Sequence, residues 1–541
     1  MPRPPFLLSL LCLLLAVPVL GVLGAWLAWD ASAIAVLQHQ LGTVLPDYAR
    51  SSLLLSLSVA VGVALLGGAT AAAVALFEFP LRRFFEWALL LPMAMPAYVA
   101  AYAYTDLLQY SGPVQSALRK AFGLQGALWP DVRSLPGAVV LFVLCLYPYV
   151  YLLTRTALTE RGVALMEAAR SLGAGTWRRV REVALPLARP ALAAGVALAL
   201  METLADYGVG SYFGLTTLTT GVYKAWLVMN DQLAAAQLAS VLLVVVLVLL
   251  WLERRAQARL RFSSSRSGAM HASEARRLPL RGLAAVGAFL LCTVPVLLGF
   301  VVPVLVLLGL LREEALHAEL GLPLERFIEW SLTSLKLAGL AAALTVALAL
   351  VLANAARQQQ GAGRRQPVLA LVIRIVGLGY AVPGAVIAVG ILLPLGWLQT
   401  RWPQLSLPAV MTGSIAGLMY AYLVRFSGVA LQSVEAGYAR ITPHVDETAR
   451  MLGASRLRLF LELHAPLLAR STLAAALLVF VDVMKELPAT LVLRPFNSDT
   501  LAVVAYQLAR DERLGEAALP SVAMVVVGLV PVLMLSRAMR R

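Results

Sequence analysis

Long apolar runs separated by short polar stretches dominate this sequence. A helix needs roughly 20 apolar residues to cross the ~30 Å hydrocarbon core of a bilayer. Twelve segments of the 541-residue chain approach that length, in two sets of six. They are 7–29, 52–77, 86–108, 137–154, 187–205 and 235–252, then 282–311, 332–356, 368–395, 410–430, 467–485 and 519–536. The pattern predicts an all-α polytopic membrane protein with about 12 transmembrane helices.

The first apolar run has one alternative interpretation. It follows Arg3, as the apolar region of a secretory signal does. However, it is longer than the ~7–15 residues of such a region and lacks a clear cleavage site. We therefore expect a retained span.

Composition agrees with the span pattern. Hydrophobic residues make up 60% of the chain and charged residues 13%, and the mean hydropathy is +0.81. Soluble domains have about 45–50% apolar and ~25% charged residues. These values exclude a disordered chain and disfavour a soluble enzyme of two or three domains.

The net charge of +15 is a signal of orientation. If the N-terminus lies in the cytoplasm and the spans alternate, 30 of the 44 Lys and Arg residues fall on the cytoplasmic side, 11 fall outside and three fall within spans. Such a bias follows the positive-inside rule. It predicts that both termini are cytoplasmic, and it removes the reason to expect a nucleic-acid partner.

One polar segment occurs twice. Residues 167–173 read Glu-Ala-Ala-Arg-Ser-Leu-Gly, and nine residues later a Val-Ala-Leu-Pro sequence ends at Pro186. Residues 447–453 read Glu-Thr-Ala-Arg-Met-Leu-Gly, and a Leu-His-Ala-Pro sequence ends at Pro466. Equivalent positions are 280 residues apart throughout. The same offset pairs Thr220 with Thr500.

The repeat divides the chain into two homologous halves. We predict a first half over 1–252, an Arg- and Ser-rich cytoplasmic linker over 253–281 and a second half over 282–541. Each half has an even number of spans, so both enter the membrane from the same side. This predicts a pseudo-two-fold axis along the membrane normal.

The duplicated segment predicts a helix-turn-helix. Its first helix ends at a glycine, which readily takes the left-handed conformation. A second short helix over 176–182 is expected to end at Pro186. Two copies with the same spacing suggest a docking element for a two-fold partner, the alternative being an ordinary amphipathic connector.

The duplicated segment resembles the EAA loop of ABC importer permeases. The resemblance implies two coupling loops, at about 155–186 and 425–466, that bind two ATPase subunits. The residues it assigns to coupling are Glu167, Ala168, Ala169, Gly173 and Pro186, and Glu447, Ala449, Gly453 and Pro466. The second copy departs from the family pattern at Thr448 and Ala465. These departures bear on whether the two docking contacts are equally strong.

The sequence contains no G-x-x-x-x-G-K-[ST] phosphate loop. We therefore expect a permease subunit that is not itself an enzyme and binds no cofactor stably. The ATP is used by the partner ATPase subunits.

Acidic residues close the fifth and eleventh spans. Glu202 and Asp206 are equivalent, at the 280-residue offset, to Asp482 and Glu486. Spacing of i, i+4 predicts that each pair shares one helix face, and two-fold symmetry brings all four towards a common axis. Ionisable groups in spans usually face a bundle interior or a water-filled path. We predict a cation path with transient metal contacts, the alternative being a helix lock neutralised by Lys485.

Tyrosines and prolines gather in the neighbouring spans. Spans three and four carry the tyrosines Tyr98, Tyr102, Tyr104, Tyr147, Tyr149 and Tyr151. We expect helix packing or an aromatic belt more than ligation. Pro92, Pro96, Pro383 and Pro394 are expected to open or kink their spans. Short segments at 220–229 and 500–509 predict outer gate helices or a surface cover.

Several stretches resemble the fused ferric-iron permeases specifically. They are residues 201–208, 211–214, 219–223, 482–490 and 494–497. The resemblance implies the type I ABC importer fold, the bacterial inner membrane and a periplasmic or surface-tethered binding protein that delivers ferric iron. Thiamine, a phosphonate or another small solute is the alternative cargo. An ion-gradient-driven secondary transporter and a non-transporting scaffold are the rival classes.

Overall fold

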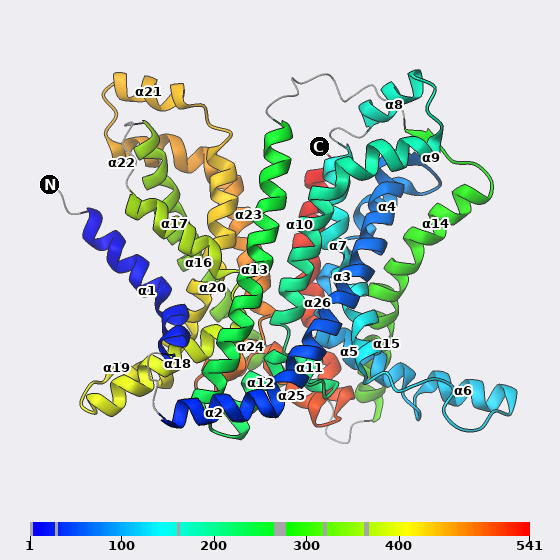
Figure 1. Cartoon of the computed structure of the whole chain (residues 1–541), viewed down its shortest axis with the longest axis horizontal. Helices are drawn as coiled ribbons and strands as arrows, with labels where there is room; N and C mark the ends of the chain where they lie inside the picture. Colours follow the sequence, from blue (N-terminus) through cyan, green and yellow to red (C-terminus); the bar gives the residue numbers. More distant parts are fainter. Residues whose placement is uncertain are drawn as a thin grey trace. The chain divides into compact units, whose positions relative to one another are not determined.

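The fold of this chain is almost wholly helical. The computed structural model describes residues 4–26, 31–159, 163–264, 277–317, 322–361 and 367–540 (Figure 1). Within these residues the exceptions to helix and loop are two strands of two residues each, β1 (Phe77–Glu78) and β2 (Leu278–Pro279), which pair in parallel.

The predicted spans correspond to helices of the structure. Ten helices of the described residues are long and apolar enough to cross a membrane, and one bent pair adds an eleventh span. These account for the second to twelfth predicted spans. The first predicted span corresponds to α1 (Pro4–Gly24), which includes a shorter apolar helix over Leu13–Gly24. The all-α polytopic fold is thereby confirmed.

Two predicted spans are interrupted. The third is bent by 89° between Arg82–Ala94 and Ala97–Phe122, and Pro96 starts the helix after the bend. The ninth divides into α17 (Pro367–Gly379) and α18 (Gly384–Arg401), and Pro383 starts the second helix. Proline has no backbone N–H to continue a helix, which explains both positions. The expected opening at Pro96 and Pro383 is therefore correct.

The chain forms two compact units, which we describe separately. Unit 1 contains Met1–Gly42, Gly221–Leu243 and Leu324–Val504, and unit 2 contains Thr43–Thr220, Val244–Pro323 and Ala505–Arg541. Three helices contain residues of both units: α12 (Leu218–Tyr223), α13 (Gln232–Ser264) and α25 (Leu501–Arg510).

The centre of unit 2 is a packed set of α3, α7 and α10, which are the second, fourth and fifth spans. α15 and α26 pack on each other, and α26 also contacts η1. The elements of unit 2, besides those already given and the shared helices, are α3 (Val44–Leu76), α4 (Arg82–Ala88), η1 (Leu91–Ala94), α5 (Ala97–Leu108), α6 (Pro113–Phe122), α7 (Leu135–Ala157), α8 (Val163–Ser171), α9 (Thr176–Arg179), η3 (Val180–Ala184), α10 (Leu185–Ala205), α11 (Gly208–Tyr212), α14 (Leu283–Val296), η5 (Leu297–Val301), α15 (Val302–His317) and α26 (Leu514–Arg540).

Unit 1 repeats this arrangement with α16, α20 and α23, the eighth, tenth and eleventh spans. α1 packs on α17 and α18 (Figure 1). Its remaining elements are α2 (Ala31–Gly42), η4 (Lys224–Val228), α16 (Leu324–Gly361), α19 (Leu407–Gly413), α20 (Ile415–Tyr438), α21 (Pro443–Met451), α22 (Arg456–Arg458), η6 (Leu459–His464), α23 (Ala465–Met484) and α24 (Pro488–Leu493).

The compact units differ from the two sequence halves. The first span, α1, belongs to unit 1, whose central helices come from the second half of the sequence. The seventh span, formed by α14, η5 and α15, belongs to unit 2, whose central helices come from the first half. Each half therefore contributes its first span to the unit built by the other. The predicted boundary at 253–281 describes the repeat and stays a prediction, and residues 265–276 of that linker lie outside the described residues.

Glycine permits the close approach of α1 to α18. A Cβ placed on Gly390 would lie 1.9 Å from the carbonyl oxygen of Pro18, and a Cβ on Gly21 would lie 2.3 Å from the carbonyl oxygen of Gly390. No side chain fits at such distances, so small residues let these two backbones touch.

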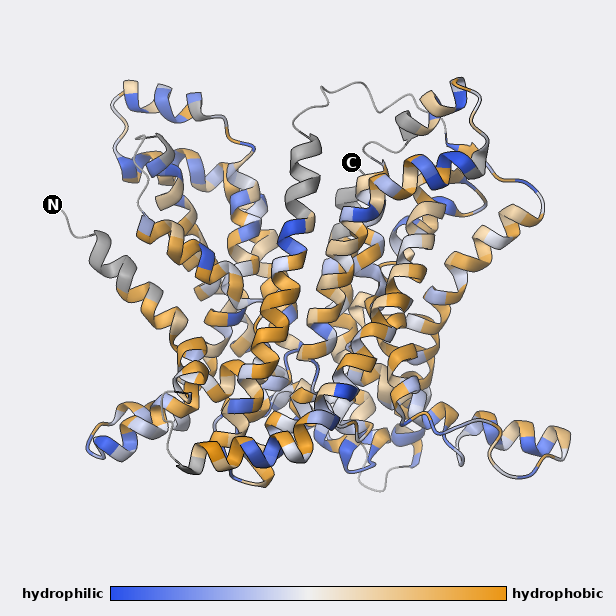
Figure 2. Ribbon diagram, in the orientation of Figure 1, coloured by the Kyte–Doolittle hydropathy of each residue, from blue (hydrophilic) through white to orange (hydrophobic). Residues whose placement is uncertain are grey.

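Hydropathy follows the elements. Figure 2 shows the spans as apolar along most of their length, whereas hydrophilic residues gather in α8, α9, α21 and α22. Many large apolar side chains on the spans are exposed, among them Leu53, Leu57, Val61 and Leu65 on one face of α3. Apolar surface of this extent on a span is suited to contact with lipid.

Candidate functional sites

The first EAA loop, which we define as residues 155–186, forms the predicted helix and turn. α8 ends at Ser171, and Gly173 follows with a φ of 80°. The N–H of Gly173 donates to the carbonyl of Arg170 (2.9 Å), and the N–H of Ala174 donates to that of Ala169 (3.0 Å). These bonds satisfy the last carbonyls of α8, as a left-handed helix terminus does.

The second EAA loop, residues 425–466, has the same local structure. α21 ends at Met451, Gly453 has a φ of 81°, and the N–H groups of Gly453 and Ala454 make the equivalent bonds, both of 3.0 Å. Residues 166–175 and 446–455 agree in burial at every position. Glu167 and Glu447 are both exposed, as are Ala168 and Thr448, whereas Ala169 and Ala449 are half-buried. The sequence repeat is thus a structural repeat.

The helix after the turn differs from our expectation. In the first loop α9 continues through the π-helical segment η3 into α10 without a break. In the second loop α22 continues through η6 into α23. The prediction that Pro186 ends the second helix is therefore wrong. The wider π-helical turn ends just before Pro186 and Pro466, and proline is tolerated in the first turn of the helix that follows.

Matched ion pairs stabilise these continuous helices. Arg178 Nε donates to Glu182 Oε2 (2.8 Å), and Arg458 Nε donates to Glu462 Oε2 (2.9 Å). Both pairs are exposed, so each contributes little to stability. Their equivalence again follows the 280-residue offset.

A buried apolar cluster holds the first EAA loop. Met166 of α8 packs with Ala184 of η3 and with Leu158. The remaining members of the cluster are Ala75, Leu76 and Ala188. One side of α8 is therefore held by apolar contacts, and Glu167 lies on the exposed side.

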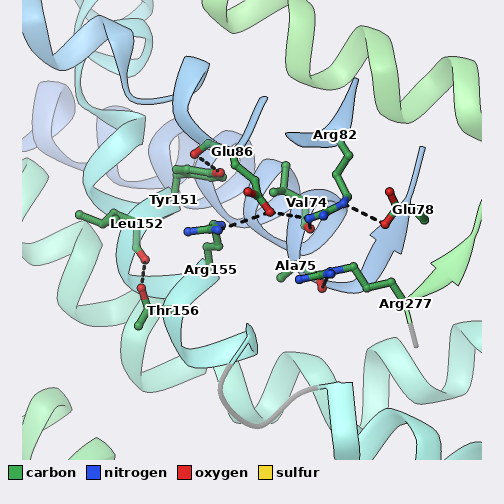
Figure 3. Close-up of polar contacts among 10 residues, drawn as sticks. All are labelled: Val74, Ala75, Glu78, Arg82, Glu86, Tyr151, Leu152, Arg155, Thr156 and Arg277. Carbon is green, nitrogen blue, oxygen red and sulfur yellow. Dashed lines mark hydrogen bonds and ion pairs between the residues drawn. The ribbon is translucent and has the colours of Figure 1, made fainter. Parts of the chain in front are cut away.

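A charged network lies beside this cluster (Figure 3). Arg82 is its centre: Nε lies 3.0 Å from Glu78 Oε2 and Nη1 lies 2.6 Å from Glu86 Oε1. Arg155 Nη2 is 3.6 Å from the same Glu86 oxygen, and Arg277 Nε donates to the carbonyl of Ala75 (3.3 Å). The network joins the ends of α3, α4 and α7 to the residues that precede β2.

The second EAA loop is held by charged groups instead. Asp446 Oδ2 accepts from Arg357 Nε (2.8 Å), and Oδ1 lies 3.0 Å from His464 Nε2. Burial opposes the ionisation of Asp446, but hydrogen bonds and charge from Arg357 and His464 outweigh it and lower its pKa. A depressed pKa means that the stabilisation is present above the ordinary carboxyl value and is lost only as pH falls through the folded value. The Asp446 carboxyl is therefore ionised at neutral pH.

The carboxylates at the end of the fifth span separate into two environments. Glu202 is half-buried within α10. α10 ends at Ala205, so Asp206 lies just beyond it, and its Oδ1 accepts from the N–H of Val209 (2.7 Å) in α11. Asp206 is the C-cap of α10 and its N–H donates to the carbonyl of Glu202 (3.0 Å), so a shared helix face for this pair stays a prediction.

The eleventh span ends in the same way. Asp482 is half-buried in α23, and Lys485 follows the end of that helix. Glu486 caps the next helix, α24. Oε1 of Glu486 accepts from the N–H of Ala489 (2.8 Å), and Oε2 accepts from the N–H of Thr490 (2.9 Å). Asp206 and Glu486 are thus equivalent caps of the short helices α11 and α24.

Glu486 also has a charged partner, Arg425, whose equivalent at the 280-residue offset is the uncharged Cys145. Arg425 Nη1 lies 3.4 Å from its Oε1, and Glu486 is only 5% exposed. A Cβ on Gly384 would lie 2.6 Å from Arg425 Nη1 and 2.8 Å from Glu486 Oε1. The pair is therefore tightly enclosed by α18, α20 and α24.

No metal cluster is formed by the described side chains: no three His, Cys, Asp or Glu residues among them lie close enough to hold an ion. Glu202 and Asp206 belong to unit 2, and Asp482 and Glu486 belong to unit 1. The predicted meeting of all four, and their transient contact with a metal, remain predictions.

A tyrosine cluster lies around Asp206 in unit 2. The rings of Tyr102 and Tyr212 are 4.7 Å apart, and those of Tyr207 and Tyr506 are 5.7 Å apart, centroid to centroid. The hydroxyls of Ser211 and Tyr506 lie 2.7 Å apart. The hydroxyl of Tyr102, a residue 1% exposed, is buried without a hydrogen-bond partner. The span-three and span-four tyrosines Tyr98, Tyr102, Tyr147 and Tyr151 are buried rather than arranged as a surface belt.

Comparison with known families decides the identity. Residues 64–262 match the binding-protein-dependent transport system inner membrane component. This region contains the first EAA loop and its flanking spans. Residues 64–262 form a domain of the binding-protein-dependent transport permeases. With ten helices of the described residues long and apolar enough to cross a membrane, the chain is a multi-pass protein of the inner membrane.

Relatives of this permease cover one or both halves. The Fe(3+)-transport system permease protein FbpB 2 of Haemophilus influenzae is 23% identical over 537 residues, 99% of each chain. The ferric transport system permease protein FbpB of Actinobacillus pleuropneumoniae is 24% identical over 78% of this chain and 61% of its own length. The sulfate transport system permease protein CysT of Escherichia coli is 30% identical over 34% of this chain and 66% of its own length. The permease is therefore of the fused, two-half type.

Some functional candidates of the permease were missed by sequence reasoning. Arg425 is 61 positions from Glu486, and only the fold brings them together. Tyr506 is likewise nearly 300 positions from Tyr207 and Ser211. An Arg within an apolar span was the one available signal for Arg425, because a charge there generally has a partner.

The turn glycine of the permease's first EAA loop offers a test. Gly173→Ala is expected to destabilise the turn by roughly 1–2 kcal/mol, because an L-residue at positive φ is strained. Trypsin cleavage of the native protein within 163–182 should become about tenfold faster, the factor that corresponds to 1.4 kcal/mol.

Gly175→Ala is the matched control for that substitution. Gly175 lies two residues further on, has no positive φ, and its added Cβ would meet nothing within 4 Å. Equal cleavage rates for the two variants would contradict the proposed role of Gly173.

Proposed function

We propose that this permease moves ferric iron into the cytoplasm as part of an ATP-driven importer. In this proposal a binding protein delivers the cargo on the outer side, and two separate ATPase subunits bind the two EAA loops. One observation carries the proposal: two loops 280 residues apart have the same helix, the same left-handed glycine and the same exposed glutamate. A two-fold ATPase dimer requires two such equivalent docking elements.

The EAA loops supply the docking surface in this proposal. Exposed Glu167 and Glu447 reach the partner, while Gly173 and Gly453 set the turns. The half-buried Ala169 and Ala449 allow close approach, and Pro186 and Pro466 start the following spans. Both loops and both termini then lie in the cytoplasm, on the side where the positive-inside rule places most basic residues. The partner subunits bind and hydrolyse ATP, and the permease holds no cofactor of its own.

Ferric iron is the proposed cargo for two reasons. The relative that matches the full length is a permease with Fe(3+) transport in its name. In addition, carboxylate and phenol oxygens suit hard cations, and unit 2 gathers Asp206 with buried tyrosines. An oxyanion is the alternative, since a sulfate permease matches a third of the chain.

The proposed path uses Glu202 and Asp482, which lie within their spans and are half-buried. Asp206 and Glu486 have cap roles that already engage one or both oxygens. Lys485 lies beside the second pair and moderates its negative charge. Tyr102, with its unpartnered buried hydroxyl, is a further candidate to face the cargo.

Reconstitution tests the function. The permease is placed in liposomes with its two ATPase subunits, and the cognate binding protein is added outside, loaded with ferric iron or free of it. We expect iron uptake that requires ATP and iron-loaded binding protein together. ATP-driven uptake of sulfate or thiamine instead of iron would refute the cargo. Uptake by the permease alone, driven by an ion gradient, would refute the importer class and support a secondary transporter. No uptake under any pairing would support a scaffold.

A further inference from the structure

The buried side of α21 holds a polar triad. Asp446 precedes Glu447 by one residue and is only 5% exposed, whereas Glu447 faces outward. The two carboxylate oxygens of Asp446 have different partners: Arg357 of α16 at 2.8 Å and His464 of η6 at 3.0 Å. Three segments distant in sequence therefore meet at one carboxylate within unit 1.

The triad is itself fixed by further contacts. Arg357 Nη2 donates to the carbonyl of Ile441 (2.8 Å), in the segment that leads into α21. The ring of Tyr438 contacts His464 edge-on at 5.2 Å between centroids, and its hydroxyl lies 3.5 Å from His464 Nδ1. That hydroxyl also donates to Asn354 Oδ1 (3.4 Å). His464 is 1% exposed, so water does not compete for these bonds.

The equivalent positions of unit 2 are apolar. At the 280-residue offset, Met166 is the sequence equivalent of Asp446, and Ala184 is the equivalent of His464. Serine hydroxyls fix the register of the second and eighth spans: Ser52 accepts from the N–H of Leu218 and Ser334 accepts from that of Leu501, both at 2.9 Å. α3 and α16 are unbroken beyond these serines, so the residue 23 positions along each helix is Ala75 in one and Arg357 in the other.

All three equivalents lie in one place. Ala75, Met166 and Ala184 are members of the buried cluster that holds α8. The same three positions are thus buried and apolar under the first EAA loop. Under the second they are hydrogen-bonded to one another, with Asp446 and His464 buried and Arg357 half-buried. Apolar contacts are non-directional and allow small shifts, whereas charge-assisted hydrogen bonds fix both distance and angle.

We propose that Asp446, held by Arg357 and His464, is the positioning residue of the second EAA loop, which makes that loop rigidly oriented while the first is compliant. The proposal rests on the proposed function only in assigning the loop to an ATPase contact. Glu447, one residue further along α21, is oriented through Asp446. The two docking contacts of this permease then differ in mechanical character.

Mobility of the loops tests this without any partner or cargo. Cys12, Cys145 and Cys292 are first replaced, and a spin label is attached to Cys at Thr448 or at its equivalent Ala168, both exposed. We expect the label at 448 to be less mobile than that at 168. Asp446→Asn removes one partner of a buried pair, so it should raise the ratio of mobile to immobile label at 448 by at least about tenfold and leave 168 unchanged.

A triple variant separates positioning from mere filling of space. Arg357→Ala, Asp446→Met and His464→Ala together install the apolar set of unit 2, which already holds a folded EAA loop. We expect a wild-type Tm, mobility at 448 equal to that at 168, and fewer ions imported per ATP in the reconstituted complex. Wild-type mobility at 448 in both the triple variant and Asp446→Asn would overturn the proposal. If the triple variant does not fold, the mobility of the label at 448 in Asp446→Asn alone decides the proposal. The mobility measurement needs no cargo, so an absence of iron uptake would contradict the proposed function without changing this result.

Discussion

Reversing the charge of Glu167 and Glu447 together should abolish ATP-driven uptake. Both side chains are exposed on equivalent helices, and neither is part of the buried contacts that hold its loop. The substitutions therefore leave the fold intact and act on the partner contact. Each lost interfacial charge contact costs about 2–5 kcal/mol, so the double Lys variant should bind the ATPase at least about a hundredfold more weakly.

ATPase binding to detergent-purified permease, followed by uptake in liposomes, measures this effect. Glu329→Lys is the matched control, since Glu329 is an exposed acid near the start of α16, far along that helix from the loop contacts. The single variants separate the two loops. Glu447 also lies 3.2 Å from His444, a contact that Glu167 does not share at the equivalent position. Normal ATPase binding by the double variant would remove the EAA loops as the docking surface.

Loss of the Glu486 carboxylate should reduce folded protein rather than transport alone. Glu486→Ala leaves Arg425 buried without its charge partner and removes the cap from two N–H groups of α24. Removing one member of a buried pair costs about 3–5 kcal/mol. We expect a clear fall in Tm and in yield, measured by fluorescence-detected size exclusion after heating.

Glu202 and Asp482 should behave in the opposite way. Glu202→Gln combined with Asp482→Asn keeps the side-chain size and one acceptor oxygen and leaves the caps of α11 and α24 in place, so the Tm should stay close to that of the wild type. If these carboxylates contact the cation as it crosses the membrane, uptake should fall at least about tenfold. A tenfold change corresponds to about 1.4 kcal/mol. Normal uptake by a folded double variant would show that these carboxylates are not part of the path.

A compensated variant controls the assignment of Glu486. Replacing both members of the pair, as Arg425→Met with Glu486→Gln, removes the unpaired charge while an acceptor for the α24 N–H groups remains. The Tm should recover most of the loss seen with Glu486→Ala. A Tm that stays low would mean that the cap and packing, rather than the ion pair, dominate at this position.

The spans and the EAA turns were predictable because their causes are local. Apolar length determines a span, and the glycine that ends α8 or α21 acts on its own helix. The break at Pro96 was also visible, since the missing N–H belongs to one residue. The outer loops were harder: Thr217 and Thr500, rather than Thr220 and Thr500, are the equivalent caps of α12 and α25. Three extra residues in one loop shift the register there.

Contacts between segments far apart in the chain could not be predicted from the sequence. Nothing near Glu486 indicates Arg425, and nothing near Asp446 indicates that Arg357 lies beneath it. The i, i+4 spacing of Asp482 and Glu486 gave no sign that α23 ends before Glu486 and that this carboxylate caps α24. Hydropathy likewise treats each span as isolated, so it gives no sign that α1 packs on helices of the second half.

That exchange of spans has a consequence for synthesis. α1 is made first, yet its packing partners α17 and α18 emerge only after more than 340 further residues. Until then, the surface around Gly21 lacks the partner that Gly390 will provide. Neither half of the chain can complete a compact unit by itself, so the fused polypeptide keeps an early, unpartnered helix tethered to the segment that it must eventually find.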